Sequence, residues 1–554
     1  PIKQIALPNI VNNLGNVHYN GTINGRLEQL ILNGAFKTSL GTIHVNGNIQ
    51  SDQTLQNFDF HGHVATSKFQ MGKLLNHFDL GTVSLESNVK GKFTANEFVY
   101  CNVHAGIQNM EYKGYNYQSI SVDGEIRPKE VNGKLSINDE NIQLYIDGLA
   151  DWSLEDTQLD IAMKLSNFKP YNVHLIEQYP ELALNATTNI SLHTFGKSNE
   201  LLDNLTGHVI VDTLQIYNGT KHAMMEQLKL LVDHHEEKGK HTHQLRLQSD
   251  FLTANLSGSF RYNTLPATIQ SILHHYLPSI VESPKQKKST NNTFDFYAYF
   301  RNLDAITQVL DLGVEIPSFP TIKGYLREDK QQIGVQAYIP YVNTSGTKME
   351  NITISLDNQR DQLGLSVFVL NHLPKDNPTA AKLGDIKANI YLYAQHDELD
   401  LQVKLGNTDS VRNEGMIHAI SKISKYNNKP KFDIQILPSN IILNDSAWTI
   451  GQSEITYALS EHVMDINNFV LHTDYQSISA NGRASTLPED SISVTLQNVN
   501  VDYLLSYTEA KKSISILGPA TGQAHIYSVF SDPMLEAQAH IRNGGLNGVY
   551  LGDV

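Results

Sequence analysis

The residues best suited to metal chemistry lie between positions 234 and 243, in the stretch HHEEKGKHTH. It holds four histidines, His234, His235, His241 and His243. Imidazole is the commonest protein ligand for transition metals, and residues two apart on a strand, such as His241 and His243, point to the same side. A solvated loop between Leu231 and the following strand explains the same residues more simply. We favour that interpretation and leave the role of the four histidines open.

A second polar group lies in the sequence FDFHGH. Asp59, His61 and His63 are spaced by two and would share one side of a strand. Carboxylate and imidazole groups in such a row can hold a metal ion. A polar, solvent-facing strand surface is the simpler interpretation, and we expect no metal site here.

The sequence motifs of common enzyme classes are absent. FGKS at 195–198 comes nearest to a phosphate-binding loop, but position 191 is Ser where the motif needs Gly. There is no G-x-S-x-G, and the residue four after His235 is Gly239, which excludes H-E-x-x-H. Carboxylates are abundant, yet their spatial pairing cannot be read from a sequence. We therefore expect no catalytic residues, no cofactor and no enzyme activity.

Composition excludes further classes. The chain of 554 residues has a formal net charge of -15, which disfavours a nucleic-acid-binding surface. Its single cysteine, Cys101, allows no internal disulfide and no cysteine-based zinc site. No apolar run approaches the roughly 18–20 residues that span a bilayer. The length exceeds the roughly 250–300 residues that one core supports, so several domains or an extended repeat are expected.

The elements that would position any functional group are strands with one apolar side. In VNGKLSINDENIQLYIDGLADW, from Val131 to Trp152, apolar residues alternate on both sides of the turn-like NDEN, which predicts a hairpin that bends at Gly133 and Gly148. Asn-Gly and Asp-Gly pairs between such runs are typical hairpin turns. The alternating apolar residues include Leu135, Ile137, Ile142, Leu144, Ile146, Leu159, Ile161, Met163, Leu165, Leu399, Leu401, Val403, Leu405, Ile492, Val494 and Leu496. The pattern predicts an all-β, antiparallel fold.

Helical periodicity is clear in one place. NTLPATIQSILHHYLPSIV predicts a helix at about 265–280. The polar stretch 281–292 is the best linker candidate and 373–385 the second, so we divide the chain into repeating β segments at 1–280 and 293–554. The chain begins at Pro1 and stops within its pattern, which suggests a segment of a longer protein.

A degenerate repeat accompanies the strands. Four times, a strand leads into a short apolar turn or helix and then into a strand that ends at glycine. These units run from Phe69 to Gly91, from Phe168 to Gly196, from Leu303 to Gly324 and from Val499 to Gly522. Similar unit lengths favour a modular β array over chance.

These stretches resemble a known family. The segment 436–505, from ILPSNIILNDSAWTIGQSEITYAL to SISVTLQNVNVDYLL, is similar to the repeating module of the TamB translocation and assembly proteins in their Bacteroidetes form. The segments 69–93, 247–279 and 522–554 resemble the same module, and the resemblance covers essentially the whole chain. AsmA-like repeat proteins share many of these features.

The resemblance implies an elongated antiparallel sheet curled into an open apolar groove, in the periplasm of a Gram-negative bacterium. It implies a bridge-like protein, anchored in the inner membrane, that conducts phospholipid between the membranes and supports outer-membrane protein assembly with an Omp85-type barrel. The anchor and the barrel-binding end would lie outside this segment. The sixteen alternating apolar residues named above would then contact acyl chains. The alternative that we keep is a structural or adhesive β-sandwich array of the cell envelope without lipid.

Overall fold

The fold is built almost entirely from antiparallel strands. In a computed structural model, the described residues form one long antiparallel sheet of 34 strands and a separate sheet of three. This confirms the all-β fold expected from the alternating pattern. The structure describes residues 13–26, 28–54, 56–94, 97–152, 157–197, 200–237, 240–285, 291–301, 303–317, 319–344, 347–358, 361–372, 385–407, 411–501 and 515–554.

The chain divides into two compact units. Unit 1 comprises Pro1–Asn255 and Ala305–Leu312, and unit 2 comprises Leu256–Asp304 and Gly313–Val554. Two elements, β16 (Leu252–Ser259) and α3 (Asp304–Val309), contribute residues to both units. The boundary predicted at 281–292 stays a prediction: residues 281–285 and 291–292 have no regular structure, and 286–290 lie outside the described residues.

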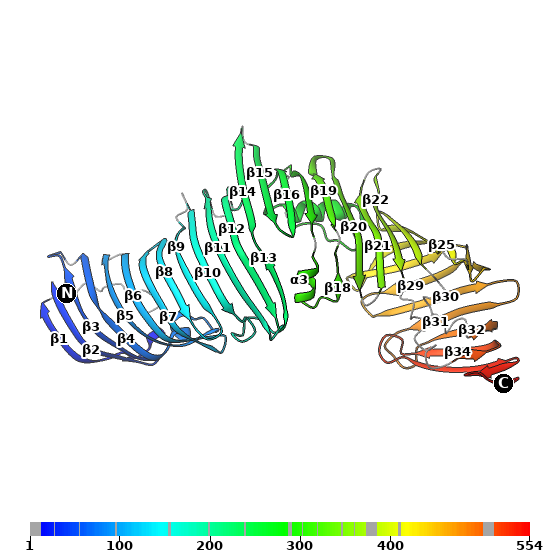
Figure 1. Cartoon of the computed structure of the whole chain (residues 1–554), viewed down its shortest axis with the longest axis horizontal. Helices are drawn as coiled ribbons and strands as arrows, with labels where there is room; N and C mark the ends of the chain where they lie inside the picture. The colour runs from blue at the N-terminus through cyan, green and yellow to red at the C-terminus, as the bar shows by residue number, and fades with distance from the viewer. Residues whose placement is uncertain are drawn as a thin grey trace. The chain divides into compact units, whose positions relative to one another are not determined.

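The strands of unit 1 pair with their successors in the chain, so that the unit is a ladder of hairpins (Figure 1). Each strand from β1 to β12 pairs with its neighbour, with bulges in some of the pairs, and β12 pairs with both β13 and β14. The elements of unit 1 are β1 (His18–Arg26), β2 (Gln29–Thr38), β3 (Gly41–Ser51), β4 (Asn57–Gln70), α1 (Met71–Leu75), β5 (Leu80–Thr94), β6 (Phe98–Tyr112), β7 (Tyr115–Arg127), β8 (Glu130–Asn138), β9 (Gln143–Trp152), β10 (Thr157–Phe168), β11 (Leu182–Thr194), β12 (Thr206–Asn218), β13 (Lys221–Met225), β14 (Leu228–Glu237) and β15 (Lys240–Ser249).

Unit 2 follows the same plan with more short strands. β25 pairs with both β26 and β27, and the small sheet consists of β33, β36 and β37. The elements are α2 (Leu265–Tyr276), β17 (Thr293–Phe300), β18 (Val314–Glu315), β19 (Thr321–Arg327), a 3-10 turn (Glu328–Lys330), β20 (Gln332–Thr344), β21 (Thr347–Asp357), β22 (Leu363–His372), β23 (Ile386–Gln395), β24 (Glu398–Asn407), β25 (Glu414–Tyr426), β26 (Lys429–Ile436), β27 (Ser439–Leu443), β28 (Ser446–Ile450), β29 (Ser453–Ala458), β30 (Val463–His472), β31 (Ser477–Ala484), β32 (Ser491–Asn500), β33 (Ile516–Leu517), β34 (Pro519–Tyr527), β35 (Met534–Ile541), β36 (Gly544–Leu546) and β37 (Val549–Gly552).

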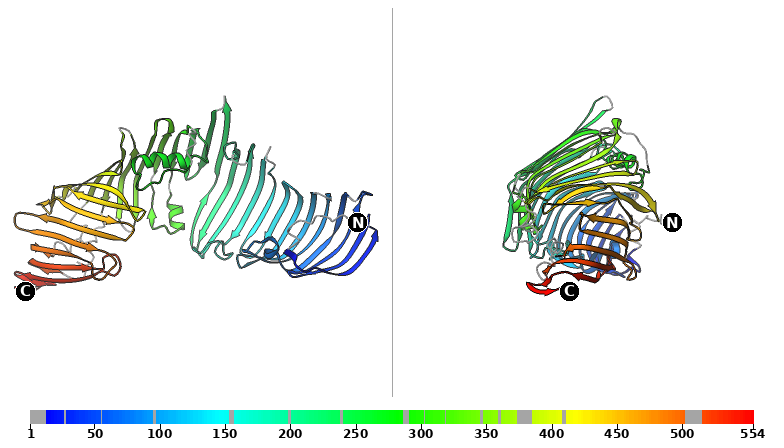
Figure 2. Two further views of the ribbon diagram at one scale, coloured as in Figure 1. Left: turned by 180° about the vertical axis from the view of Figure 1, so that it is seen from behind. Right: turned by 90° about the vertical axis from the view of Figure 1, so that its right-hand side faces the viewer.

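The helix predicted at about 265–280 corresponds to α2, which ends four residues earlier, at Tyr276, before Pro278. It lies across the neighbouring strands of unit 2 (Figure 2). Ile272 is fully buried, and the Tyr276 hydroxyl accepts a hydrogen bond of 3.0 Å from Asn358 Nδ2. The helix is therefore fixed along the strand ends by both apolar and polar contacts.

Single-residue bulges interrupt the register at recurring points. The residues with a left-handed backbone at five of these interruptions are Lys68, Asn167, Asn351, Asn468 and Asn498. A bulge of this kind re-aims the side chains that follow it. Three of the four predicted repeat units begin directly after a bulge, at Phe69, Phe168 and Val499.

Candidate functional site

The main feature of unit 1 is a row of apolar residues that crosses the strands from β1 to β15. Each member lies directly opposite the next one on the neighbouring strand, so the row runs perpendicular to the strands. We call it the central row of unit 1. Its members are Ile23, Leu32, Gly47, Gly62, Val89, Val103, Gly124, Gly133, Gly148, Ile161, Ile190, Val209, Leu230 and Leu247.

Two further rows flank it on the same side of the sheet. The first flanking row continues through Val45, Val64, Ser87, Ala105, Val122, Leu135, Ile146 and Met163. The second flanking row continues through Ile49, Phe60, Gly91, Cys101, Ile126, Val131, Ala150, Leu159, Leu192, Gly207, Val232 and Leu245. Together the three rows form a broad apolar face.

The opposite side of the same strands is polar. One residue away from the central row, the corresponding cross-strand row is Thr22, Asn33, Asn46, His63, Asn88, His104, Asp123, Lys134, Asp147, Ala162, Asn189, Ile210, Lys229 and Gln248. This contrast confirms that the strands are one-sided, as their alternation predicts.

Unit 2 has the same two-sided character. Its central row is Ala298, Ile322, Ala337, Ile354, Val367, Ile390, Val403 and Ile417. The neighbouring row on the other side is Tyr297, Lys323, Gln336, Ser355, Ser366, Tyr391, Gln402 and His418. Nearer the C-terminus, an apolar row runs through Ile434, Ile455, Ile466, Gly482, Ile492, Ile526 and Leu535.

The apolar face is not covered by a second layer along these rows. No member of either central row is buried: Ile23 is 57% exposed, and all the others are half-buried. In an ordinary β-sandwich, the inner side of each sheet is closed by the other sheet. Here the middle of the sheet keeps an apolar surface that is open to a ligand.

One edge of the apolar face in unit 1 is closed. The connection between β10 and β11, residues 169–181, folds back over the strand ends, and Val173 is fully buried there with Tyr117, Ile120 and Ile142. His174 Nδ1 lies 3.0 Å from the carbonyl oxygen of Lys113. This connection therefore forms a wall at one end of the strands.

Two other short segments close the same edge. After β4, the segment with α1 buries Phe69, which is 1% exposed, and Lys113 N donates a hydrogen bond of 2.7 Å to Asp79 O. Next to the β12–β13 hairpin, Val309 of α3 is 1% exposed and accepts a hydrogen bond of 2.8 Å from Asn218 Nδ2. Each wall segment follows a repeat start predicted from sequence, at Phe69, Phe168 and Leu303.

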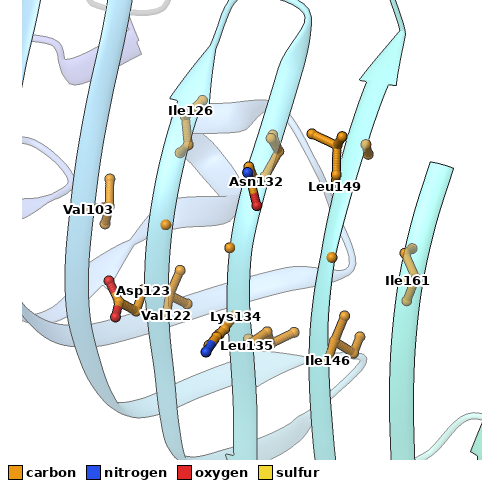
Figure 3. A pocket seen from close by; sticks show the side chains of 15 residues that line it. Val103, Val122, Asp123, Ile126, Asn132, Lys134, Leu135, Ile146, Leu149 and Ile161 are labelled. Atoms are coloured by element: carbon orange, nitrogen blue, oxygen red, sulfur yellow. The ribbon is translucent and has the colours of Figure 1, made fainter. Parts of the chain in front are cut away.

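A shallow hollow lies in the central row where three glycines meet. Gly124, Gly133 and Gly148 are consecutive across β7, β8 and β9, and larger residues surround them. The hollow has a volume of about 210 Å³. Figure 3 shows its wall, to which successive strands contribute Val103, Ile126, Leu135, Ile146 and Ile161.

Glycine is required there by the neighbouring backbone. A Cβ on Gly148 would come within 2.4 Å of the Asp160 carbonyl oxygen, and one on Gly133 within 2.6 Å of Gly124 Cα. Such contacts are too short for any side chain, and glycine in a strand commonly marks a bend or a close approach. The bend predicted at Gly133 and Gly148 stays a prediction.

The predicted lining residues all lie on the apolar side. Ile142 and Ile492 are buried, at 7% and 8% exposure, whereas Leu405 is 40% exposed. The remaining thirteen are partly exposed: Leu135, Ile137, Leu144, Ile146, Leu159, Ile161, Met163, Leu165, Leu399, Leu401, Val403, Val494 and Leu496. Their contact with acyl chains stays a prediction. Ile142 packs inside the wall described above and is the member least able to meet a ligand.

Two titratable groups at the apolar face have raised pKa values. The Tyr115 hydroxyl donates a hydrogen bond of 2.5 Å to Asp139 Oδ1, and Asp139 is 5% exposed. Burial, followed by this hydrogen bond, raises the pKa of Tyr115 to about 12. Burial also raises the pKa of the Cys101 thiol, which belongs to the second flanking row. Both groups are therefore uncharged near neutral pH.

Among the described residues, no group of three or more His, Cys, Asp or Glu side chains has a geometry that could hold a metal ion. Asp59, His61 and His63 are exposed on the polar side of β4, as expected. The solvated loop expected at 234–243 is wrong, because His234 and His235 lie in β14 and His241 and His243 in β15. His243 is only 2% exposed, His234 and His241 are partly exposed, and His235 is exposed.

Sequence reasoning missed the bulges and their partners. The backbone N–H of the left-handed residue donates to a side chain on the next strand: Lys68 N to Ser84 Oγ at 2.9 Å, Asn167 N to Asn185 Oδ1 at 2.7 Å, Asn468 N to Asn481 Oδ1 at 2.6 Å and Asn498 N to Thr521 Oγ1 at 3.0 Å. The available signal was a polar residue, asparagine in three of these four cases, directly before an apolar one.

No protein-family model matches the chain, and no curated protein matches it significantly. The resemblance to the TamB proteins therefore stays a prediction. Of the described helices, none combines the length and the hydrophobicity needed to cross a bilayer.

Proposed function

We propose that the apolar face binds the acyl chains of phospholipids and guides them along the sheet. The observation that carries this proposal is the central row, which stays apolar and uncovered across the strands of each unit. An uncovered apolar surface of this extent marks a binding site. A lipid is the occupant that its shape favours, because an alkyl chain can lie along a row and continue onto the next strand.

The energetics suit transport rather than storage. Burial of an alkyl chain gains about 0.8 kcal/mol per methylene, so even partial contact with the rows holds a chain. The hollow of about 210 Å³ is smaller than the roughly 300–1,000 Å³ of typical ligand pockets. A uniform row without a deep pocket would bind an acyl chain at many equivalent positions, and the chain could slide between them.

The edges suit a molecule with one polar end. In unit 1 the segments beside Phe69, Val173 and Val309 close one edge of the face. A headgroup would then remain in water near the opposite edge while the acyl chains lie against the rows. This arrangement avoids the large cost of burying an unpaired charge.

The wider role follows from the family resemblance. We propose a bridge-like protein of the periplasm that conducts phospholipid between the inner and outer membranes and supports outer-membrane protein assembly. Contacts with an Omp85-type barrel and with the inner membrane would use regions outside this segment. Neither catalysis nor a cofactor is part of the proposal.

Lipid occupancy tests the proposal directly. Native mass spectrometry of protein prepared without detergent is expected to show co-purified phospholipid. The absence of lipid after expression in a Gram-negative host would contradict the proposal, provided that the protein is folded.

The chain's own cysteine supplies a second test. Cys101 lies in the second flanking row, so bound lipid should protect its thiol from a maleimide. The matched control carries Cys101→Ala and Ala162→Cys, since Ala162 is exposed on the polar side. Delipidation should speed the labelling of Cys101 several-fold and leave position 162 unchanged.

The alternative, a structural or adhesive β-sandwich array of the cell envelope without lipid, stays open. That alternative expects β-sandwiches, whereas the described residues form one long sheet with one small additional sheet. It also expects stable proteolytic fragments cut near 285 and 378, and position 378 lies outside the described residues. Such fragments together with lipid-free protein would favour it.

A further inference from the structure

Three histidines lie in mutual contact at the tip of the β14–β15 hairpin. His234 is directly opposite His243, and Glu236 is opposite His241. The ring of His234 is 5.1 Å from that of His243 and 5.4 Å from that of His241, centroid to centroid, and both pairs are stacked. His234 Nε2 and His241 Nδ1 are 3.2 Å apart, a hydrogen-bonding distance.

The cluster lies on the apolar side of the sheet. Val232 and Leu245 belong to the second flanking row, and His234 and His243 are two residues further along the same strands, on the same side. His243 is 2% exposed. The His241 side chain is 19% exposed. The three imidazoles thus extend an apolar surface with titratable groups.

The described part of the connection between β11 and β12, residues 195–197 and 200–205, lies against the cluster. The Phe195 ring is 6.4 Å from the ring of His234, and Asn204 Nδ2 donates a hydrogen bond of 2.8 Å to Phe195 O. Asp203 in this connection is 2% exposed and acts electrostatically on His234. The histidines therefore join the hairpin tip to a segment that precedes it in the chain.

The charged groups around His234 act in opposite directions. Burial lowers the pKa of His234 most, and the charge of His241 lowers it further. Glu236 and Asp203 raise it, and His235, on the other side of the strand, lowers it. Glu236 Oε1 is 4.0 Å from His241 Nε2. Asp233 and Arg246 pair with each other on the opposite side, at 3.0 Å. Together these effects lower the pKa of His234 and favour its neutral form.

We propose that the contacts of His234 with His241 and His243 form a pH-sensitive latch that holds this end of the β14–β15 hairpin, the tip, against Phe195 and residues 200–205 at neutral pH and releases it on acidification. A hydrogen bond between two imidazoles needs at least one unprotonated nitrogen, so it is lost when both rings are protonated. Two imidazolium ions in stacking contact also repel strongly where water is largely excluded.

The direction of the effect follows from proton linkage. A histidine in an open, solvated tip has a pKa of about 6.5, whereas that of His234 in the closed tip is lower. Below about pH 6.5 the open state therefore binds more protons, and the closed state loses stability as pH falls. The opening equilibrium should rise up to about tenfold per pH unit for each proton taken up.

The latch goes beyond the proposed lipid function and does not depend on it. Release would uncover Val232 and Leu245, which are the last members of the second flanking row in unit 1. Acidification would in this way lengthen the accessible apolar face at one defined place. A pH switch of this kind relies on histidine because its charge changes between about pH 5 and 8.

Hydrogen–deuterium exchange of the whole chain tests the latch. Exchange rates, corrected for the intrinsic effect of pH, are compared at about pH 7.5 and about pH 5.5. Peptides covering 194–206 and 228–249 should open up to about tenfold more at the lower pH, which is the limit for one histidine whose pKa is about 6.5 in the open state. The β8–β9 hairpin, residues 130–152, contains no histidine and serves as the internal control. Equal protection of the tip at both pH values would overturn the proposal.

Variants separate titration from packing. His234→Phe keeps a ring beside Phe195 but cannot titrate, so the tip should stay protected at both pH values. His235→Phe, on the exposed opposite side, should keep the wild-type pH dependence. An undiminished pH response in the double variant His234→Phe/His241→Phe would also overturn the proposal. If the tip of a variant is unprotected even at about pH 7.5, that variant is not used. The proposal then stands or falls on the wild-type protein, by whether its tip opens more than the 130–152 hairpin at the lower pH.

Discussion

Gly133 lies directly opposite Gly148 in the antiparallel β8–β9 pair, on the apolar side of the sheet. On its other flank Gly133 faces Gly124, and a Cβ on Gly133 would come within 2.5 Å of the Asp123 carbonyl oxygen. Three strands can approach one another this closely only because none of them carries a side chain at this point. The same absence of side chains creates the hollow in the central row.

Replacement of Gly133 by valine should therefore destabilise unit 1. The clash involves neighbouring backbone, which cannot move aside as a flexible side chain could, and overpacking of this kind typically costs about 1–3 kcal/mol. Thermal unfolding measures the loss. The matched control is Gly106→Ala in β6, where a Cβ would meet nothing within 4 Å, and its effect should stay within about 0.5 kcal/mol. Equal effects would contradict the packing argument.

A charge on the apolar face of unit 2 should impair lipid binding more than a charge reversal on the polar side. Leu401 lies in the row beside Val403, between Leu392 and Ala419, whereas Lys404 is exposed on the other side of β24. Leu401→Arg places a cation where acyl chains would pass, and Lys404→Glu does not. Native mass spectrometry should show a several-fold loss of bound phospholipid for the first variant only. Similar occupancy in both would count against acyl contact at this row.

The alternation of β24 illustrates what the sequence predicts well. Leu399, Leu401, Val403 and Leu405 share one side because successive residues of a strand point to opposite sides, a local rule that needs no knowledge of neighbouring strands. The helix at 265–276 is likewise local, since its apolar spacing and Pro266 lie within a few turns.

The alignment of residues across strands is not local. Gly124, Gly133 and Gly148 meet because the registers of two hairpins agree, and one slip of register would move them apart. The contact between Phe195 and His234 has the same origin, because the two residues lie on different elements far apart in the chain. The wall at Val173 could not be predicted from the sequence either, because the sequence does not show which edge of the sheet the connection 169–181 crosses.

Loss of a bulge partner should loosen β10 and β11. Asn185 Oδ1 accepts a hydrogen bond of 2.7 Å from the backbone N–H of Asn167, whose φ of 48° lies in the left-handed region. Asn185→Ala leaves that partly buried N–H without its acceptor, at a cost of about 1–3 kcal/mol. Hydrogen exchange in 157–194 should increase.

Asn189→Ala is the matched control for this strand. Asn189 is exposed on the polar side of β11 and donates to Asp212 Oδ2 at 3.0 Å. Its loss should cost less than about 1 kcal/mol, because water can replace an exposed partner. A larger effect from the control than from Asn185→Ala would show that the bulge does not depend on its side-chain acceptor.

The Tyr115–Asp139 hydrogen bond should make the stability of the walled edge depend on alkaline pH. The pKa of Tyr115 is raised to about 12 in the folded state, by burial first and by the bond to Asp139 second. A raised pKa stabilises the fold below the unfolded value of about 10, and this contribution is lost as pH rises from about 10 to about 12.

Tyr115→Phe removes both the bond and the titration. It should cost about 1–3 kcal/mol near neutral pH and flatten the alkaline decline. Hydrogen exchange of 108–145 and thermal unfolding across this pH range measure both effects. Tyr145→Phe is the control, because Tyr145 is 43% exposed and its hydroxyl lies 3.3 Å from Asp147 Oδ2. An alkaline decline as steep in Tyr115→Phe as in the wild type would show that another group titrates at this edge.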